Sequence, residues 1–166
     1  MRPFGGYVQT IMERGAQEAR RDGSATIEAE HLLLAIAAED ESSTRELLAS
    51  AGLDHEAIRD ALEREFRHSL SAAGVTVAGG TLPRSSKAAN RPTRLGASAR
   101  LVVERGVAAA ASKRDLRPAH LLLGVLRLKV GTVPRALALA GVDQSELATR
   151  VQRSLPGAER AAKDER

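Results

Sequence analysis

An apolar octapeptide, Ala29-Glu-His-Leu-Leu-Leu-Ala-Ile36, is the most informative segment of this 166-residue chain because its centre occurs twice. His31-Leu-Leu-Leu34 returns as His120-Leu-Leu-Leu123, an offset of 89 residues (120 minus 31). At the same offset, Ala51-Gly-Leu-Asp54 aligns with Ala140-Gly-Val-Asp143. Several blocks that share one spacing predict an internal duplication.

Each copy of the duplication is expected to fold into four helices. In the first copy, the segment 29–38 is apolar on nearly all sides, which predicts a buried helix. The box Ser43-Thr-Arg-Glu46 predicts the start of the next helix, with the Ser43 hydroxyl as its cap. Gly52 predicts its end, because glycine tolerates the left-handed backbone of a C-terminal cap. Asp54 caps the fourth helix. The first helix is expected at about 7–21, before Gly23. Three apolar residues share one face of the fourth helix: Ile58, Leu62 and Phe66.

The second copy repeats this pattern. Pro118 suits the first turn of a helix, and Thr132 and Asp143 are expected to cap the two helices that follow. The copies align without a gap from His31 to Leu62, and upstream Ala19 is matched with Ala108. The expected helices are at about 98–112, 118–128 and 132–141, and from 144 onward.

The domain organisation follows from these elements. The first repeat is assigned to residues 1–68 and the second to 94–155. Residues 69–93 are rich in Gly, Ser, Ala and Pro and predict a linker, and 156–166 form a charged tail. The sequence therefore predicts an all-α protein in which two tandem four-helix repeats form a pseudo-twofold eight-helix bundle.

The composition excludes several classes of site. The chain is 43% hydrophobic and 28% charged, which is typical of a globular protein. Aromatic residues make up only 2%, so aromatic stacking platforms for single-stranded nucleic acid are not expected. The absence of Cys excludes disulfides and thiolate metal sites. No apolar run is long enough for a membrane span and no signal peptide is visible, so a cytoplasmic location is expected.

The charge is distributed unevenly along the chain. Residues 28–65 contain eleven acids and three bases, a net charge of −8, whereas 67–153 contain fifteen bases and four acids, a net charge of +11. The basic half makes nucleic-acid binding the alternative function, although the acidic half opposes the approach of phosphate. The basic side chains concerned are Arg91, Arg94, Arg100, Arg105, Lys113, Arg114 and Arg117.

The repeat resembles the N-terminal double Clp-N domain of Clp-type AAA+ unfoldases. That family has a Thr-Glu-His-hydrophobic-Leu-Leu-Gly-Leu motif and a Leu-Gly-hydrophobic turn in each unit. Here the first motif reads Ala29-Glu-His-Leu-Leu-Leu-Ala-Ile36 and the second reads Pro118-Ala-His-Leu-Leu-Leu-Gly-Val-Leu126. The resemblance covers residues 4–154 and implies an eight-helix domain that docks adaptors and substrates. The ATPase motif is missing: the nearest match, 74–81, has Gly80 where the phosphate-binding Lys is required.

The resemblance also suggests binding residues. Some members of the family recognise phosphorylated arginine through the Glu of each motif, which is Glu30 in the first unit here and is replaced by Ala119 in the second. We therefore expect weak or absent phosphoarginine binding, and Glu30 can equally serve to stabilise its helix N-terminus. A second family surface is an apolar patch with an aromatic near the start of each repeat. Phe4 and Leu95 occupy those positions, although Phe4 can equally serve as a packing residue.

The remaining polar motifs indicate structure more than chemistry. His31 and His120 are expected to hydrogen-bond locally at their helix starts and to help join the two halves. Ser98, in a sequence that resembles a nucleophile elbow without its second Gly, is expected near a helix N-cap. No convergent acid, base and nucleophile are visible, so an enzyme is not expected, and neither is a metal or cofactor.

The function expected from the sequence is therefore a non-catalytic protein-binding or peptide-binding module of the Clp protease system. Its expected partners are the Clp unfoldase, its adaptors or substrates, and cyclic peptides that target the unfoldase N-domain. The protein is expected to be a free-standing monomer that does not contact membranes.

Overall fold

The computed structural model describes residues 4–40, 42–74 and 92–156, and this part of the chain is all-α. The linker 69–93 and the tail 156–166 lie largely outside it, as does most of the Gly-rich segment 74–81. No described helix is long and apolar enough to cross a bilayer. The helices of the described part are α1 (Phe4–Arg21), α2 (Ala29–Ala38), α3 (Ser42–Ser50), α4 (His55–Ala72), α5 (Ala97–Ala108), α6 (Pro118–Leu126), α7 (Thr132–Leu139) and α8 (Gln144–Arg153), with a short 3-10 turn at Lys113–Asp115.

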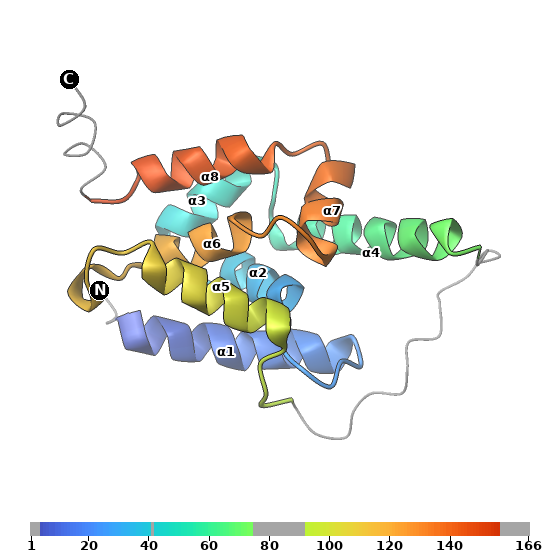
Figure 1. Cartoon of the computed structure of the whole chain (residues 1–166), viewed down its shortest axis with the longest axis horizontal. Coiled ribbons are helices and arrows are strands. Elements are labelled where there is room, and N and C mark those ends of the chain that lie inside the picture. Colours follow the sequence, from blue (N-terminus) through green and yellow to red (C-terminus); the bar gives the residue numbers. More distant parts are fainter. Residues whose placement is uncertain (1–3, 41, 75–91, 157–166) are drawn as a thin grey trace.

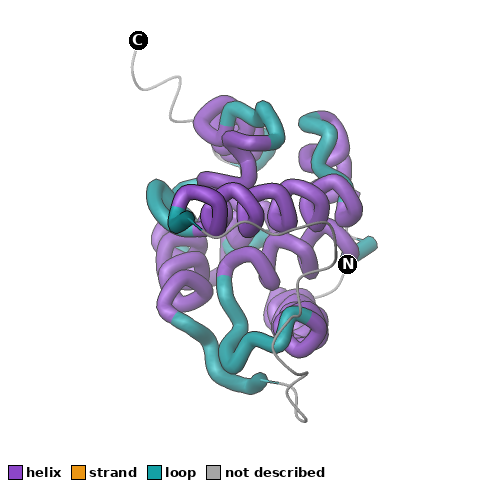
Figure 2. Tube along the Cα trace, turned by 90° about the vertical axis from the view of Figure 1, so that its right-hand side faces the viewer, coloured by secondary structure: helices purple, strands orange, loops and turns teal. Residues whose placement is uncertain are grey.

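The apolar helices α2 and α6 lie at the centre of the bundle, as the sequence predicts. They lie between α1 and α5 on one side and α3 and α8 on the other (Figure 1). Figure 2 shows these layers from a second direction, with the loops at the periphery. In α2 every residue from Ala29 to Ala37 is buried except Glu30, and in α6 every residue from Ala119 to Leu126 is buried. A helix without a polar face is stable in water only when other elements enclose it in this way.

The helix ends confirm most of the predicted caps. The Asp54 carboxylate accepts the Ala57 N–H at 2.7 Å, and its counterpart Asp143 accepts the Glu146 N–H at 3.0 Å. Gly52 and Gly141 both have φ of +72°, a conformation that L side chains rarely adopt. Each glycine therefore ends a helix in the same left-handed turn.

Two predicted caps are wrong. Helix α3 begins at Ser42, so Ser43 lies inside the helix and the capping position falls on residue 41, outside the described residues. Thr132 is the first helical residue of α7, and the cap is Gly131 with φ of +108°. The residue at the cap of α7 has a backbone conformation that favours glycine. The cap is therefore Gly131, and Thr132 follows it inside the helix.

The start of the second repeat also differs from the predicted alignment. Arg14 donates to the Ala38 carbonyl oxygen at 3.4 Å, and Arg105 donates to the Arg127 carbonyl oxygen at 2.6 Å. These equivalent bonds place α5 at an offset of 91 residues from α1 (105 minus 14), whereas α6 keeps the offset of 89 from α2. The two hydrogen-bonded residues are therefore two positions closer in the sequence in the second repeat (127 minus 105 is 22) than in the first (38 minus 14 is 24), and Ala19 does not correspond to Ala108.

Helix α4 extends to Ala72, four residues into the stretch assigned to the linker. Its second half projects beyond the body of the bundle (Figure 1). Phe66 lies on this half, on the same face of the helix as Ile58, but it is 52% exposed whereas Ile58 is buried. The neighbouring Glu65 is buried instead, where its carboxylate accepts the Arg135 Nε–H of α7 at 2.8 Å.

Gly124 allows α5 and α6 to approach each other closely. A Cβ at this position would lie 2.2 Å from the Val102 carbonyl oxygen and 3.0 Å from the Gly106 nitrogen. We predict that Gly124→Ala lowers the free energy of unfolding by about 1–3 kcal/mol, because the two helices must separate. Gly5→Ala is the control, since nothing lies within 4 Å of its Cβ and alanine favours the helix. Urea denaturation measures both; equal midpoints would contradict the prediction.

Candidate functional site

The two repeated histidines serve as structural groups at the starts of α2 and α6. The His31 Nδ1 accepts the Glu28 N–H at 2.9 Å, and the His120 Nδ1 accepts the Arg117 N–H at 3.0 Å. Both rings are buried. Burial lowers the pKa of His120, although the hydrogen bond at Arg117 opposes this change. The predicted local hydrogen bonds are confirmed, so the motif histidines are committed to helix starts.

A backbone bridge between the repeats is made by other residues. Ile27, just before α2, forms an isolated parallel bridge with Leu95: its N–H donates to the Arg94 carbonyl oxygen at 2.9 Å, and its carbonyl oxygen accepts the Gly96 N–H at 2.8 Å. The Nε2 of His31 is directed to its own repeat, where it lies 3.1 Å from Asp22.

Ser98 adds to this contact by capping a helix of the other repeat, and we call the region formed by Ile27, Leu95 and Ser98 the seam. Its hydroxyl accepts the Ala29 N–H at the start of α2 at 2.9 Å and donates to the Glu28 carboxylate. The sequence predicts that Ser98 lies near an N-cap, but the helix that it caps is α2 and not its own α5. Burial raises the pKa of Glu28, but hydrogen bonds from Ser98 and Thr26 outweigh it and hold that pKa below its usual value.

Glu30 lies beside the seam as a half-buried carboxyl group in the first turn of α2. Burial raises its pKa, and the carboxylates of Glu28 and Asp22 act in the same direction against the favourable effects of its own backbone N–H and of His31. Its counterpart in α6, Ala119, is buried and carries no charge. The carboxylate is therefore present in one repeat only.

Phe4 and Leu95 are not brought together. Phe4 begins α1, is half-buried, and stacks on Tyr7 with ring centroids 6.5 Å apart. Leu95 bridges Ile27, beyond the other end of α1. An 18-residue helix is about 27 Å long, so the two side chains lie at opposite ends of the layer formed by α1 and α5 (Figure 1). Leu95 thus belongs to the seam, beside which Glu30 lies.

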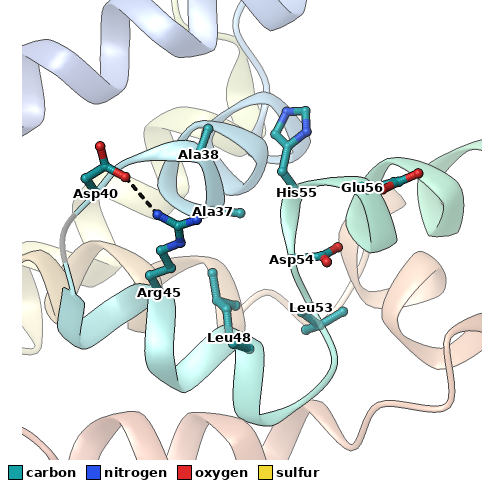
Figure 3. Close-up of a pocket in the computed structure, with 10 residues that line it drawn as sticks. Ala37, Ala38, Asp40, Arg45, Leu48, Leu53, Asp54, His55 and Glu56 are labelled. Atoms are coloured by element: carbon teal, nitrogen blue, oxygen red, sulfur yellow. Dashed lines mark hydrogen bonds and ion pairs between the residues drawn. The ribbon is translucent and has the colours of Figure 1, made fainter.

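A cleft that sequence reasoning did not find lies between the end of α2, helix α3 and the start of α4 (Figure 3). It has a volume of about 350 Å³. Beside it, the Glu18 carboxylate of α1 accepts from His55 at 2.8 Å and from Arg59. The residues that line the cleft are Ala37, Ala38, Asp40, Arg45, Leu48, Ala49, Leu53, Asp54, His55 and Glu56. Among the described residues, no group of three or more His, Asp or Glu side chains could hold a metal ion.

Comparison with known families agrees with this architecture. The model of the Clp repeat (R) N-terminal domain matches residues 4–91, more than half of the chain. The chain belongs to this family. The matched residues include α1 to α4, and no ATPase domain is matched. A search of curated proteins found no significant match. Domains of this family are generally modules that bind substrates or adaptors and are typically non-catalytic.

The seam can be tested by removing the Ser98 hydroxyl. We predict that Ser98→Ala lowers the free energy of unfolding by roughly 1–3 kcal/mol, because the Ala29 N–H loses its cap and the Glu28 carboxylate loses a donor. Ser145→Ala is a matched control, because Ser145 is likewise the second residue of its helix and is exposed. Thermal and urea unfolding measure the difference. A loss no larger than that of the control would show that the seam does not stabilise the bundle.

The raised pKa of Glu30 predicts a pH-dependent effect of its charge. A carboxyl pKa that is higher in the folded than in the unfolded state stabilises the fold at low pH, and this stabilisation is lost as the pH rises through the folded-state pKa. We therefore predict that Glu30→Gln increases stability at pH 7 relative to the unsubstituted protein, and that the difference disappears near pH 3. Unfolding curves between these two pH values test this. A substitution that destabilises the protein at pH 7 would contradict it.

Proposed function

We propose that this protein is a non-catalytic binding module of the Clp protease system that docks adaptors, substrates or peptides that target the N-domain of the unfoldase. The observation that carries the proposal is the match to the Clp repeat N-terminal domain over residues 4–91. The geometry supports it, because the buried motif residues His31 and His120 are committed to holding helix starts. The groups that remain for recognition lie at the surface.

Glu30 is the charged group that we assign to peptide recognition. A half-buried carboxylate binds a guanidinium or ammonium group more strongly than an exposed one, because less water competes for it. The charge repulsion from Glu28 and Asp22, which helps to raise the pKa of Glu30, would be relieved by a cation from a partner. Leu95 at the same seam offers apolar contact, and Phe4 offers a separate one at the start of α1.

The test is capture of partners by the tagged protein from its own lysate after nuclease treatment. We predict enrichment of a Clp unfoldase, its adaptors or its substrates. Glu30→Ala and Phe4→Ala are each expected to reduce the captured amount about tenfold, which corresponds to roughly 1.4 kcal/mol. Ser145→Ala, on the opposite layer, should leave it unchanged.

Two results would contradict the proposal. One is the absence of any Clp component from the captured proteins. The other is binding to DNA that weakens steeply with salt, which would favour the basic second half as a nucleic-acid surface. Exposed side chains there include Lys113, Arg114 and Arg117 around the 3-10 turn.

Phosphoarginine recognition is expected to be weak or absent. Only Glu30 is available for a guanidinium group, since Ala119 replaces its counterpart and Ala29 replaces the Thr of the family motif. We predict no saturable binding of a phosphoarginine peptide in the micromolar range by calorimetry. Micromolar binding that Glu30→Ala abolishes would overturn this expectation.

A further inference from the structure

The two repeats differ at the first residue of their last helix, and the difference opens a site in the first repeat. In the second repeat this residue is Gln144. Its Nε2 donates to the Leu126 carbonyl oxygen at 2.8 Å and to the Leu128 carbonyl oxygen at 2.6 Å. One nitrogen thus binds two backbone acceptors at the C-terminal end of α6, where the helix dipole places partial negative charge.

In the first repeat the equivalent residue is His55, which does not take this position. Its Nε2 lies 2.8 Å from Glu18 Oε1, so the ring is directed toward α1 and away from Leu48 (Figure 3). Ala37, the counterpart of Leu126 at the offset of 89, lines the cleft. The end of α2 therefore borders an open volume of about 350 Å³ at the place that Gln144 occupies in the second repeat.

The cleft combines an apolar floor with an acidic rim. Leu48 and Leu53 are each only 1% exposed and form the floor, and small side chains such as Ala49 form the walls. The rim contains three carboxylates and one guanidinium, a net charge of −2; the rim residues are Asp40, Asp54, Glu56 and Arg45. Arg45 is already paired with Asp40 at 2.7 Å.

The corresponding rim of the second repeat is neutral. At the offset of 89 its residues are Lys129, Pro134, Asp143 and Ser145, one base and one acid. The first repeat thus combines an open cleft with an excess of negative charge that the equivalent residues of the second repeat lack. Such a site attracts a cation, and a cation with a long apolar stem satisfies both the floor and the rim.

We propose that this cleft receives the lysine side chain of a bound peptide, with the ammonium group in the position that the amide of Gln144 occupies in the second repeat. An ammonium group carries three N–H donors on one nitrogen. It can therefore donate to two carbonyl oxygens at once, as the Nε2 of Gln144 does in the second repeat. The four-carbon stem lies over Leu48 and Leu53. The proposal rests on the peptide-binding function proposed above, but it assigns a surface distinct from Glu30 and Phe4.

The test is a titration of the ¹⁵N-labelled full chain with acetyl-Gly-Lys-Gly-amide, followed by NMR. We expect saturable shifts of the Ala38, Ala49 and His55 amides, with a Kd on the order of 1 mM, as is reasonable for one anchored side chain. The same peptide with norleucine, which keeps the stem and lacks the charge, should bind at least about tenfold more weakly. Equal binding of the two peptides, or no saturable shift at these amides, overturns the proposal.

Substitutions localise the effect. His55→Gln introduces the side chain that fills the second repeat and should weaken lysine binding about tenfold. Glu56→Gln changes only an exposed rim charge, so it should fold normally and weaken binding about threefold. Ser145→Ala, its counterpart on the other rim, should leave the Kd unchanged. Undiminished binding in a folded His55→Gln or Glu56→Gln protein overturns the assignment to this cleft.

The outcomes separate this proposal from the broader function. If the lysine peptide binds at the cleft and the lysate yields no Clp component, the cleft stands and the Clp function fails. If Clp components are captured and the lysine peptide shifts nothing at the cleft, the function stands and this site fails.

Discussion

The enclosure of α2 and α6 is the constraint on which the rest of the structure depends. Each helix is buried on all sides apart from the half-exposed ends that carry groups such as Glu30. Neither repeat covers its own apolar helix alone: α2 also contacts α5, α6 and α7, and α6 also contacts α1, α2 and α3. Each repeat therefore helps to bury the apolar helix of the other. The seam at Ile27 and Leu95 adds a backbone contact between them.

The sequence was sufficient to predict the elements that depend on local chemistry. The duplicated apolar segments, the caps at Asp54 and Asp143 and the glycine turns at Gly52 and Gly141 are all found as predicted. Each involves contacts within a few residues, so the pattern of residue types specifies them. The predictions that were wrong concern the caps Ser43 and Thr132 and the match of Ala19 with Ala108. These depend on the backbone conformation at a helix start and on the number of residues between equivalent points of two helices, neither of which residue periodicity measures.

At the candidate site, too, the sequence identified some residues and could not predict others. Glu30 could be identified from its motif, and the structure adds that it is half-buried beside two other carboxylates. The role of Ser98 could not be predicted, because it caps a helix 69 residues away in the sequence. The cleft could not be predicted either, since it depends on the direction in which the His55 ring points. That direction is set by Glu18, which lies 37 residues away in the sequence.

Comparison of the repeats separates residues that maintain the fold from residues available for recognition. Positions that keep the same contact in both copies are structural, as Arg14 and Arg105 illustrate by binding equivalent carbonyl oxygens. Positions where the copies differ do not keep a shared contact. His55 and Gln144 are such a pair, because their side chains bind different partners. Several of the differing positions are acidic in the first repeat and neutral or basic in the second. The duplication preserves its internal bonds while its surface diverges in charge, so Glu30 and two of the acidic residues that line the cleft lie in the first repeat and have no acidic counterpart at Ala119, Lys129 and Ser145.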